Sequence, residues 1–143
     1  MSAEPVALTR LSAEPITLDE CEQAVHSPAH GAVVTFAGVV RDHDEGRGVL
    51  RLAYEAHPDA GDALLASAGR IAQRWPEARI AAMHRVGTLV VGELALACAV
   101  ASAHRAEAFE ACAALVDDIK ATVPIWKEQA FHDGTSEWVA SLG

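Results

Sequence analysis

The sequence predicts an α+β fold in which three helices pack on a mixed or antiparallel sheet. The expected elements follow the order β-α-β-β-α-β-β-α-β-β, and pairs of adjacent strands between helices favour such a sheet over a doubly wound parallel one. Hydrophobic residues make up 51% of the 143 residues, which suffices for the core of a single domain over residues 1–143. We find no internal repeat and no linker that would divide it.

In the first half of the chain, short apolar runs alternate with turn signals. Thr17 and Glu20 have the spacing of a capping box and predict a short helix to about His26. A second helix is expected between Pro58 and Pro76, because proline is tolerated at a helix start and stops a helix elsewhere. The predicted strands of this half are residues 4–11, 31–41 and 49–57. The second of these strands is so rich in apolar and β-branched residues that we expect it to be buried.

In the second half, a long helix is expected from His104 to Thr122, with Ser102 as its candidate cap and Pro124 as its stop. Its apolar residues recur at three-to-four spacing and are Ala108, Phe109, Cys112, Leu115, Val116 and Ile119. The predicted strands are residues 79–91, interrupted near Gly87, and residues 93–103, followed by a hairpin of residues 125–132 and 136–140 around Asp133 and Gly134.

Composition and charge exclude several classes of function. The net charge of -9 argues against a nucleic-acid-binding protein, which needs a basic surface. No apolar stretch is long enough to span a membrane, and the N-terminal residues lack the pattern of a signal peptide, so the expected location is the cytoplasm. Cys21, Cys98 and Cys112 are widely spaced, which predicts reduced thiols rather than disulfides or a zinc site. We expect no cofactor and no metal.

The two lysines are the most informative feature of the composition. The chain has nine arginines but only Lys120 and Lys127, which stand on either side of Pro124. An ammonium group releases its proton when its pKa is lowered, whereas a guanidinium group does not. Two retained amines therefore indicate proton transfer, nucleophilic attack or phosphate contact. The alternative is that both are solvated surface lysines.

Two further groups of cations are candidates for anion binding. Ser102, His104 and Arg105 stand where a strand becomes the long helix, and the helix dipole and free N–H groups favour an anion at that end. Arg41 ends an apolar strand and precedes a polar turn, whose carboxylates lack the spacing of a calcium loop. The alternatives are a capped, solvent-facing helix start and an exposed arginine at a strand end.

The predicted long helix separates two of these cations. Arg105 and Lys120 are fifteen residues apart, which corresponds to about 22 Å along a helix, too far for one small ligand. In a symmetric homodimer, the helix start of one subunit can meet the helix end of the other and give two equal sites. The sequence therefore predicts a homodimer with shared sites.

Several short segments occur together in a fixed order, namely Phe36–Arg41, Tyr54–Ala56, His84–Gly87, Ser102–Arg105 with Ala108 and Phe109, Ile119–Lys120, and Pro124–Lys127. Together they resemble the large (catalytic) subunit of molybdopterin synthase. The resemblance covers about residues 30–139, and its most specific parts are the SAHR, IK and PIWK segments.

The resemblance implies an α/β hammerhead-type fold and a homodimer within a heterotetramer. It also implies a small ubiquitin-like sulfur-carrier subunit whose C-terminal Gly-Gly thiocarboxylate enters a pocket of the large subunit. The implied sulfurtransferase reaction moves sulfur to cyclic pyranopterin monophosphate and forms the dithiolene of molybdopterin, a step of molybdenum cofactor biosynthesis. The alternatives are a non-catalytic dimeric anion-binding or scaffold module, and a thiol-based transferase that uses Cys112.

The resemblance also assigns roles to individual residues. Lys120 and Lys127 match catalytic and binding lysines of the family, and their division of labour stays open. The implied substrate-binding residues are Val39, Val40, Arg41, His104, Arg105, Lys120, Lys127, Glu128 and Gln129. Phe36 and Val116 match positions near the inserted tail. The chain departs from the family at Glu128 and Gln129, where a basic residue and then Glu are usual, so one cation is missing.

Overall fold

The computed structural model describes residues 4–140, which form three helices and two sheets. The first sheet has the strand order β1 (Val6–Ser12), β5 (Arg79–Arg85), β7 (Leu94–Ser102) and β2 (Ala32–Val39). Strands β1 and β5 are parallel, whereas β5 with β7 and β7 with β2 are antiparallel. The sheet is therefore mixed, and the predicted α+β class is confirmed.

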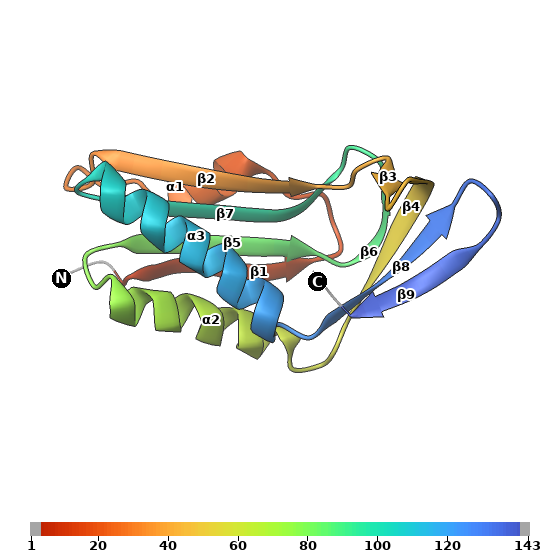
Figure 1. Ribbon diagram of the computed structural model, residues 1–143. Coiled ribbons are helices and arrows are strands. Elements are labelled where there is room, and N and C mark those ends of the chain that lie inside the picture. Colours follow the sequence, from red (N-terminus) through yellow and green to blue (C-terminus); the bar gives the residue numbers. More distant parts are fainter. Residues whose placement is uncertain (1–3, 141–143) are drawn as a thin grey trace.

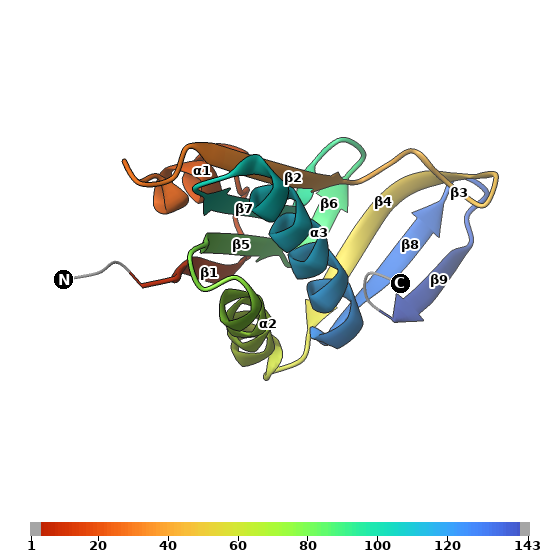
Figure 2. The same ribbon diagram turned by 60° about the vertical axis from the view of Figure 1, so that its left-hand side comes forward.

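The second sheet is built around β4 (Arg47–Ala56), which pairs with the two-residue β3 (His43–Asp44), with β6 (Gly87–Val90) and with β8 (Ile125–Phe131). Strand β9 (Ser136–Ala140) pairs with β8, and every pairing in this sheet is antiparallel. Figures 1 and 2 show the long strands of this sheet projecting beyond the end of the first sheet.

The three helices cover both faces of the first sheet (Figure 1). Helix α1 (Leu18–Val25) packs on one face, and α2 (Ala60–Arg74) and α3 (Arg105–Thr122) pack on the other. Alternate residues of a strand point to opposite faces, so β5 and β7 contribute to two cores. The residues facing α1 are Ala81, Met83, Ala97, Ala99 and Ala101. Those facing α2 and α3 are Ile80, Ala82, Leu96, Cys98 and Val100.

Local sequence signals explain several element boundaries. Thr17 Oγ1 accepts a hydrogen bond from the backbone N–H of Glu20 at 3.2 Å, and Glu20 Oε2 accepts one from the N–H of Thr17 at 3.2 Å, so the predicted capping box is present. Gly87 has a φ of 94°, a conformation that glycine adopts without strain. It lies where the chain leaves β5 in the first sheet and enters β6 in the second. Between residues 4 and 140, no helix is both long enough and apolar enough to cross a membrane.

Three expectations about local structure were wrong. Strand β2, expected to be buried, is an edge strand whose Val39 is 56% exposed, because an apolar run does not reveal whether a strand has one neighbour or two. Phe109, expected in the buried stripe of α3, is 61% exposed, and Ala111 is buried instead. Ser102 does not cap α3: its hydroxyl donates to Glu107 at 3.1 Å, and the N-cap residue is His104.

Candidate functional site

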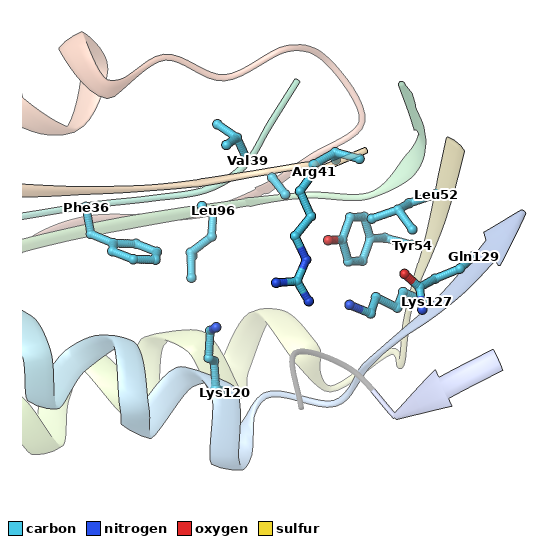
Figure 3. Close-up of a pocket in the computed structure, with 12 residues that line it drawn as sticks. Phe36, Val39, Arg41, Leu52, Tyr54, Leu96, Lys120, Lys127 and Gln129 are labelled. Atoms are coloured by element: carbon cyan, nitrogen blue, oxygen red, sulfur yellow. The ribbon is translucent and has the colours of Figure 1, made fainter. Parts of the chain in front are cut away.

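A pocket of about 250 Å³ lies at the junction of the two sheets and the C-terminal end of α3. Figure 3 shows the side chains of Arg41, Lys120 and Lys127 entering it from three different directions, with their nitrogen atoms turned toward one another. The pocket is lined by Phe36, Gly38, Val39, Val40, Arg41, Leu52, Tyr54, Ala95, Leu96, Lys120, Lys127 and Gln129. Three cations thus share one cavity in a chain whose net charge is -9.

The register of β4 against β8 selects which of their side chains reach the pocket. Tyr54 pairs with Lys127 and Leu52 pairs with Gln129, and all four line the cavity. Directly paired residues of an antiparallel ladder share a face of the sheet, whereas the next residue along points the other way. Glu128 therefore faces the opposite side of the sheet, where it lines a separate pocket.

Arg41 is anchored through its neighbour Val40. The N–H of Val40 donates to the carbonyl of Glu93 at 3.0 Å, and its carbonyl accepts from the N–H of Gly92 at 2.7 Å. Glu93 is itself held by the buried Arg85, whose Nη1 donates to the carboxylate at 2.8 Å. The backbone before Arg41 is fixed in this way, while the Arg41 side chain is 68% exposed and can reach a ligand.

Lys120 stands in the last turn of α3. That turn is held against α2 because Asp118 accepts hydrogen bonds from Ser67 and Arg70. Pro124 then ends the helical stretch, and β8 returns along β4, which carries Lys127 back to the same cavity. The two lysines are brought together by the change from helix to strand between them.

The pocket disfavours the charged form of one amine. Burial lowers the pKa of Lys127 below its ordinary value, and the neighbouring Arg41 and Lys120 lower it as well. The carboxylates of Asp44 and Glu137 act in the opposite direction and raise it. An amine with a lowered pKa and nearby cations is suited to proton transfer or to contact with an anion.

Tyr54 places a hydroxyl group in the pocket, and Figure 3 shows it pointing toward the guanidinium group of Arg41. The Tyr54 residue is only 6% exposed, and burial raises the pKa of its hydroxyl to about 12, so the group is a hydrogen-bond donor at neutral pH. The Tyr54 ring meets the buried His84 edge to face, with 5.0 Å between ring centroids. Among residues 4–140, the Tyr54 hydroxyl has no hydrogen-bond partner, which leaves it available to a ligand.

The sequence-based site residues fall into two groups. Those lining the pocket are Phe36, Val39, Val40, Arg41, Lys120, Lys127 and Gln129. His104 and Arg105 lie at the opposite end of α3 and are exposed, and neither Val116 nor Glu128 lines the pocket. Sequence reasoning gave no role in the site to Leu52 or Tyr54, although their alternation along β4 was a usable signal for side chains on one face.

The cysteines lie away from this chemistry. All three are free and buried, and none of them lines the pocket. Burial raises the pKa of the Cys112 thiol to about 11, so it holds little thiolate at neutral pH. This disfavours the thiol-based transferase. In the described part of the chain, no group of three or more His, Cys, Asp or Glu residues is arranged to hold a metal ion.

Comparisons with known proteins agree on one family. The family described as "MoaE protein" matches residues 11–122. The molybdopterin synthase catalytic subunit of Halalkalibacterium halodurans is 41% identical over 127 residues, covering 88% of this chain and 81% of the relative. The catalytic subunit of Rattus norvegicus is 39% identical over 136 residues, which cover 94% of this chain and 68% of the relative. The crystal structure of molybdopterin synthase from Staphylococcus aureus superposes with a TM-score of 0.85 at 31% identity, covering 97% of this chain and 99% of that one.

Proposed function

Because this chain belongs to the MoaE protein family, we propose that it is the catalytic subunit of a molybdopterin synthase, an enzyme of molybdenum cofactor biosynthesis. The observation that carries the proposal is the convergence of Arg41, Lys120 and Lys127 on one cavity. An acidic protein that gathers three cations in one place is equipped to bind an anion there.

The proposed reaction is transfer of sulfur from a thiocarboxylate to cyclic pyranopterin monophosphate, which yields the dithiolene of molybdopterin. Both reactants carry negative charge, and each would repel the other in water. The guanidinium of Arg41 and the ammonium of Lys120 offset this repulsion by pairing with phosphate or thiocarboxylate oxygens. Lys127, whose pKa is lowered by burial, supplies a group that can give or accept a proton beside them.

The other predicted residues complete the site in this proposal. Val39 and Val40 form an apolar wall next to Arg41, and Phe36 provides a further apolar surface suited to the inserted tail of the partner. Gln129 contributes an amide to the lining of the cavity. Val116 and Glu128 do not line the cavity of the single chain. Their proposed roles, Val116 toward the tail and Glu128 toward the substrate, are to be tested by mutagenesis.

A second copy of the chain would supply His104 and Arg105. The cavity of about 250 Å³ lies below the roughly 300–1,000 Å³ of typical small-molecule sites, which fits a site that another chain completes. We propose a symmetric homodimer in which the N-terminal end of one α3 meets the pocket of the other subunit. The exposed imidazole and guanidinium at that end would then add to the cations of the pocket.

The sulfur donor in this proposal is a small ubiquitin-like subunit with a C-terminal Gly-Gly thiocarboxylate, giving a heterotetramer with the dimer. The relatives are named as catalytic subunits, which supports an assembly with a second kind of subunit. A cavity lined by apolar residues together with three cations suits an extended tail without bulky side chains that ends in an anion.

The direct test is to incubate the protein with a thiocarboxylated small subunit and the cyclic pterin, and to measure the dithiolene product. Lys120→Ala and Lys127→Ala should each lower product formation by a factor of about 100 or more, because each removes a charged group from the reacting centre. Lys120→Arg and Lys127→Arg keep the charge and lose the titratable amine, so they separate anion binding from proton transfer.

The matched control is Arg51→Ala, which removes a cation from the opposite face of β4 and outside the pocket. This variant should keep activity within a factor of two. Co-elution with the small subunit should persist in all variants. Unchanged product formation in both lysine-to-alanine variants would instead support the non-catalytic anion-binding or scaffold module.

A further inference from the structure

Gln129 is buried beside two carboxylates, and these surroundings suit an amide rather than a carboxylate. The side chain is 3% exposed, and its Nε2 donates two hydrogen bonds, to Asp44 Oδ2 at 2.8 Å and to Glu137 Oε1 at 3.0 Å. A carboxylate at position 129 would have no proton to share with either neighbour and would place three negative charges together. The amide is therefore matched to the carboxylate of Asp44.

Asp44 also contacts the cations of the pocket. Its Oδ1 accepts a hydrogen bond from Arg41 Nη2 at 3.2 Å, while Oδ2 is engaged by Gln129. The hydrogen bond from Gln129 lowers the pKa of Asp44 below its usual value, and the charges of Lys127 and Arg41 lower it as well, so the group is ionised at neutral pH. The Asp44 side chain is only 23% exposed, so solvent and salt screen its charge less than that of a fully solvated carboxylate.

We propose that Asp44 is a positioning residue of the pocket, which orients Arg41 and Gln129 and supplies the counter-charge beside Lys127. The inference rests on the proposed function for its catalytic consequences, whereas the geometry around Lys127 can be tested without turnover.

The charges that face Lys127 come from four different segments. Asp44 on β3 and Glu137 on β9 favour its protonated form, whereas Arg41 after β2 and Lys120 on α3 disfavour it. Asp44 is the stronger of the two favourable carboxylates. Its removal leaves two cations and one weaker carboxylate around the Lys127 amine, so the amine should lose its proton at lower pH.

The test compares Asp44→Asn with Asp42→Asn. Asp42 lies in the same turn and loses the same charge, but its carboxylate contacts His43 rather than Arg41 or Gln129. Because the chain has only two lysines, NMR of selectively labelled lysine side chains yields two resolvable signals. In Asp44→Asn, the titration of Lys127 should shift to lower pH by about one unit. The limb of the pH–activity profile that reflects Lys127 should shift in the same direction.

The kinetic expectation for Asp44→Asn is a rise in the KM for the cyclic pterin of about five- to tenfold, because Arg41 loses the contact that orients it. Asp42→Asn should change neither KM nor the Lys127 titration measurably. Identical behaviour of the two variants would overturn the proposal. An inactive wild-type protein whose Lys127 titration still responds to Asp44→Asn would refute the proposed function and leave the positioning role standing.

A charge exchange gives an independent check. Gln129→Glu alone places a third carboxylate against Asp44 and Glu137 and should impair both stability and turnover. Adding Asp44→Asn to it restores an amide–carboxylate pair across the same hydrogen bond, so the double variant should be more active than Gln129→Glu alone. If the second substitution instead adds its own loss, Asp44 and Gln129 do not act as a pair and the proposal fails.

Discussion

Arg70 and Asp118 form a bidentate ion pair that joins α2 to α3. The Nε and Nη2 atoms of Arg70 donate to the two carboxylate oxygens of Asp118 at 3.0 and 2.6 Å, and Ser67 Oγ donates to the same carboxylate at 2.6 Å. The hydrogen bonds from Arg70 and Ser67 lower the pKa of Asp118 to about 2. Asp118 lies two residues before Lys120, so this pair sets the position of the helix turn that delivers Lys120 to the pocket.

Asp118→Asn should lower the free energy of unfolding by about 1–2 kcal/mol at pH 7. This range already allows for solvent screening of the ion pair, since the Arg70 side chain is 46% exposed. Urea unfolding measures the loss. The control is Asp117→Asn, since within residues 4–140 this neighbour forms no hydrogen bond or ion pair. A carboxylate with a depressed pKa stabilises the fold above its unfolded pKa and loses that effect as the pH falls, so the difference between wild type and Asp118→Asn should vanish between about pH 4 and pH 2.

His84 predicts a second pH dependence, at milder acidity. Burial lowers its pKa from 6.5 to about 4, and its Nδ1 is engaged by the carbonyl of Arg85 at 2.5 Å. Below pH 6.5, this histidine is protonated in the unfolded chain, whereas in the folded protein it stays neutral down to about pH 4. The free energy of unfolding therefore falls as the pH drops through this window. We expect a loss of about 2 kcal/mol between pH 7 and pH 4.5 from this residue.

The measurement for His84 is the slope of unfolding free energy against pH. His84→Asn loses packing against Tyr54 and starts less stable at pH 7, but its slope between pH 7 and pH 4.5 should be shallower than that of the wild type. Equal slopes in wild type and His84→Asn would contradict the assignment.

Tyr54→Phe tests the hydroxyl in the pocket. The substitution removes one oxygen, which has no hydrogen-bond partner in the described chain, and keeps the ring that packs against His84. The melting temperature should therefore change by less than about 2 °C, whereas kcat/KM should fall about three- to tenfold because a donor to the ligand is lost. Unaltered kinetics would show that the hydroxyl does not contact the substrate during turnover.

Periodic patterns predicted the elements of this fold but not which sheet each strand joins. Residues 79–91 read as one strand interrupted near Gly87, and nothing local to them reveals that β5 pairs with β7 whereas β6 pairs with β4. Strand pairing depends on long-range packing, which local β-strand propensity does not reveal. The same limit explains β2, whose apolar run belongs to an edge strand.

The site was predictable where residue type is chemically unusual, and not where a common residue acquires its role from its neighbours. Lys120 and Lys127 stand out in an arginine-rich chain, and the structure brings them to one cavity. Asp44 looked like an ordinary member of a polar turn. Its contact with Arg41 is local, but its contact with Gln129 arises only because β3 and β8 both lie beside β4.

The shared site of the proposed homodimer predicts complementation between two inactive variants. Lys120 and Arg105 lie at opposite ends of α3, so in a dimer with shared sites they serve different pockets. A heterodimer of Lys120→Ala with Arg105→Ala would then hold one pocket with both defects and one pocket with neither. Random mixing makes half of the dimers mixed, so the mixture should regain about a quarter of wild-type activity. Dimers purified with two different affinity tags should regain half. Activity no greater than the mean of the two separate variants would mean that each chain builds its pocket alone, and that His104 and Arg105 act elsewhere.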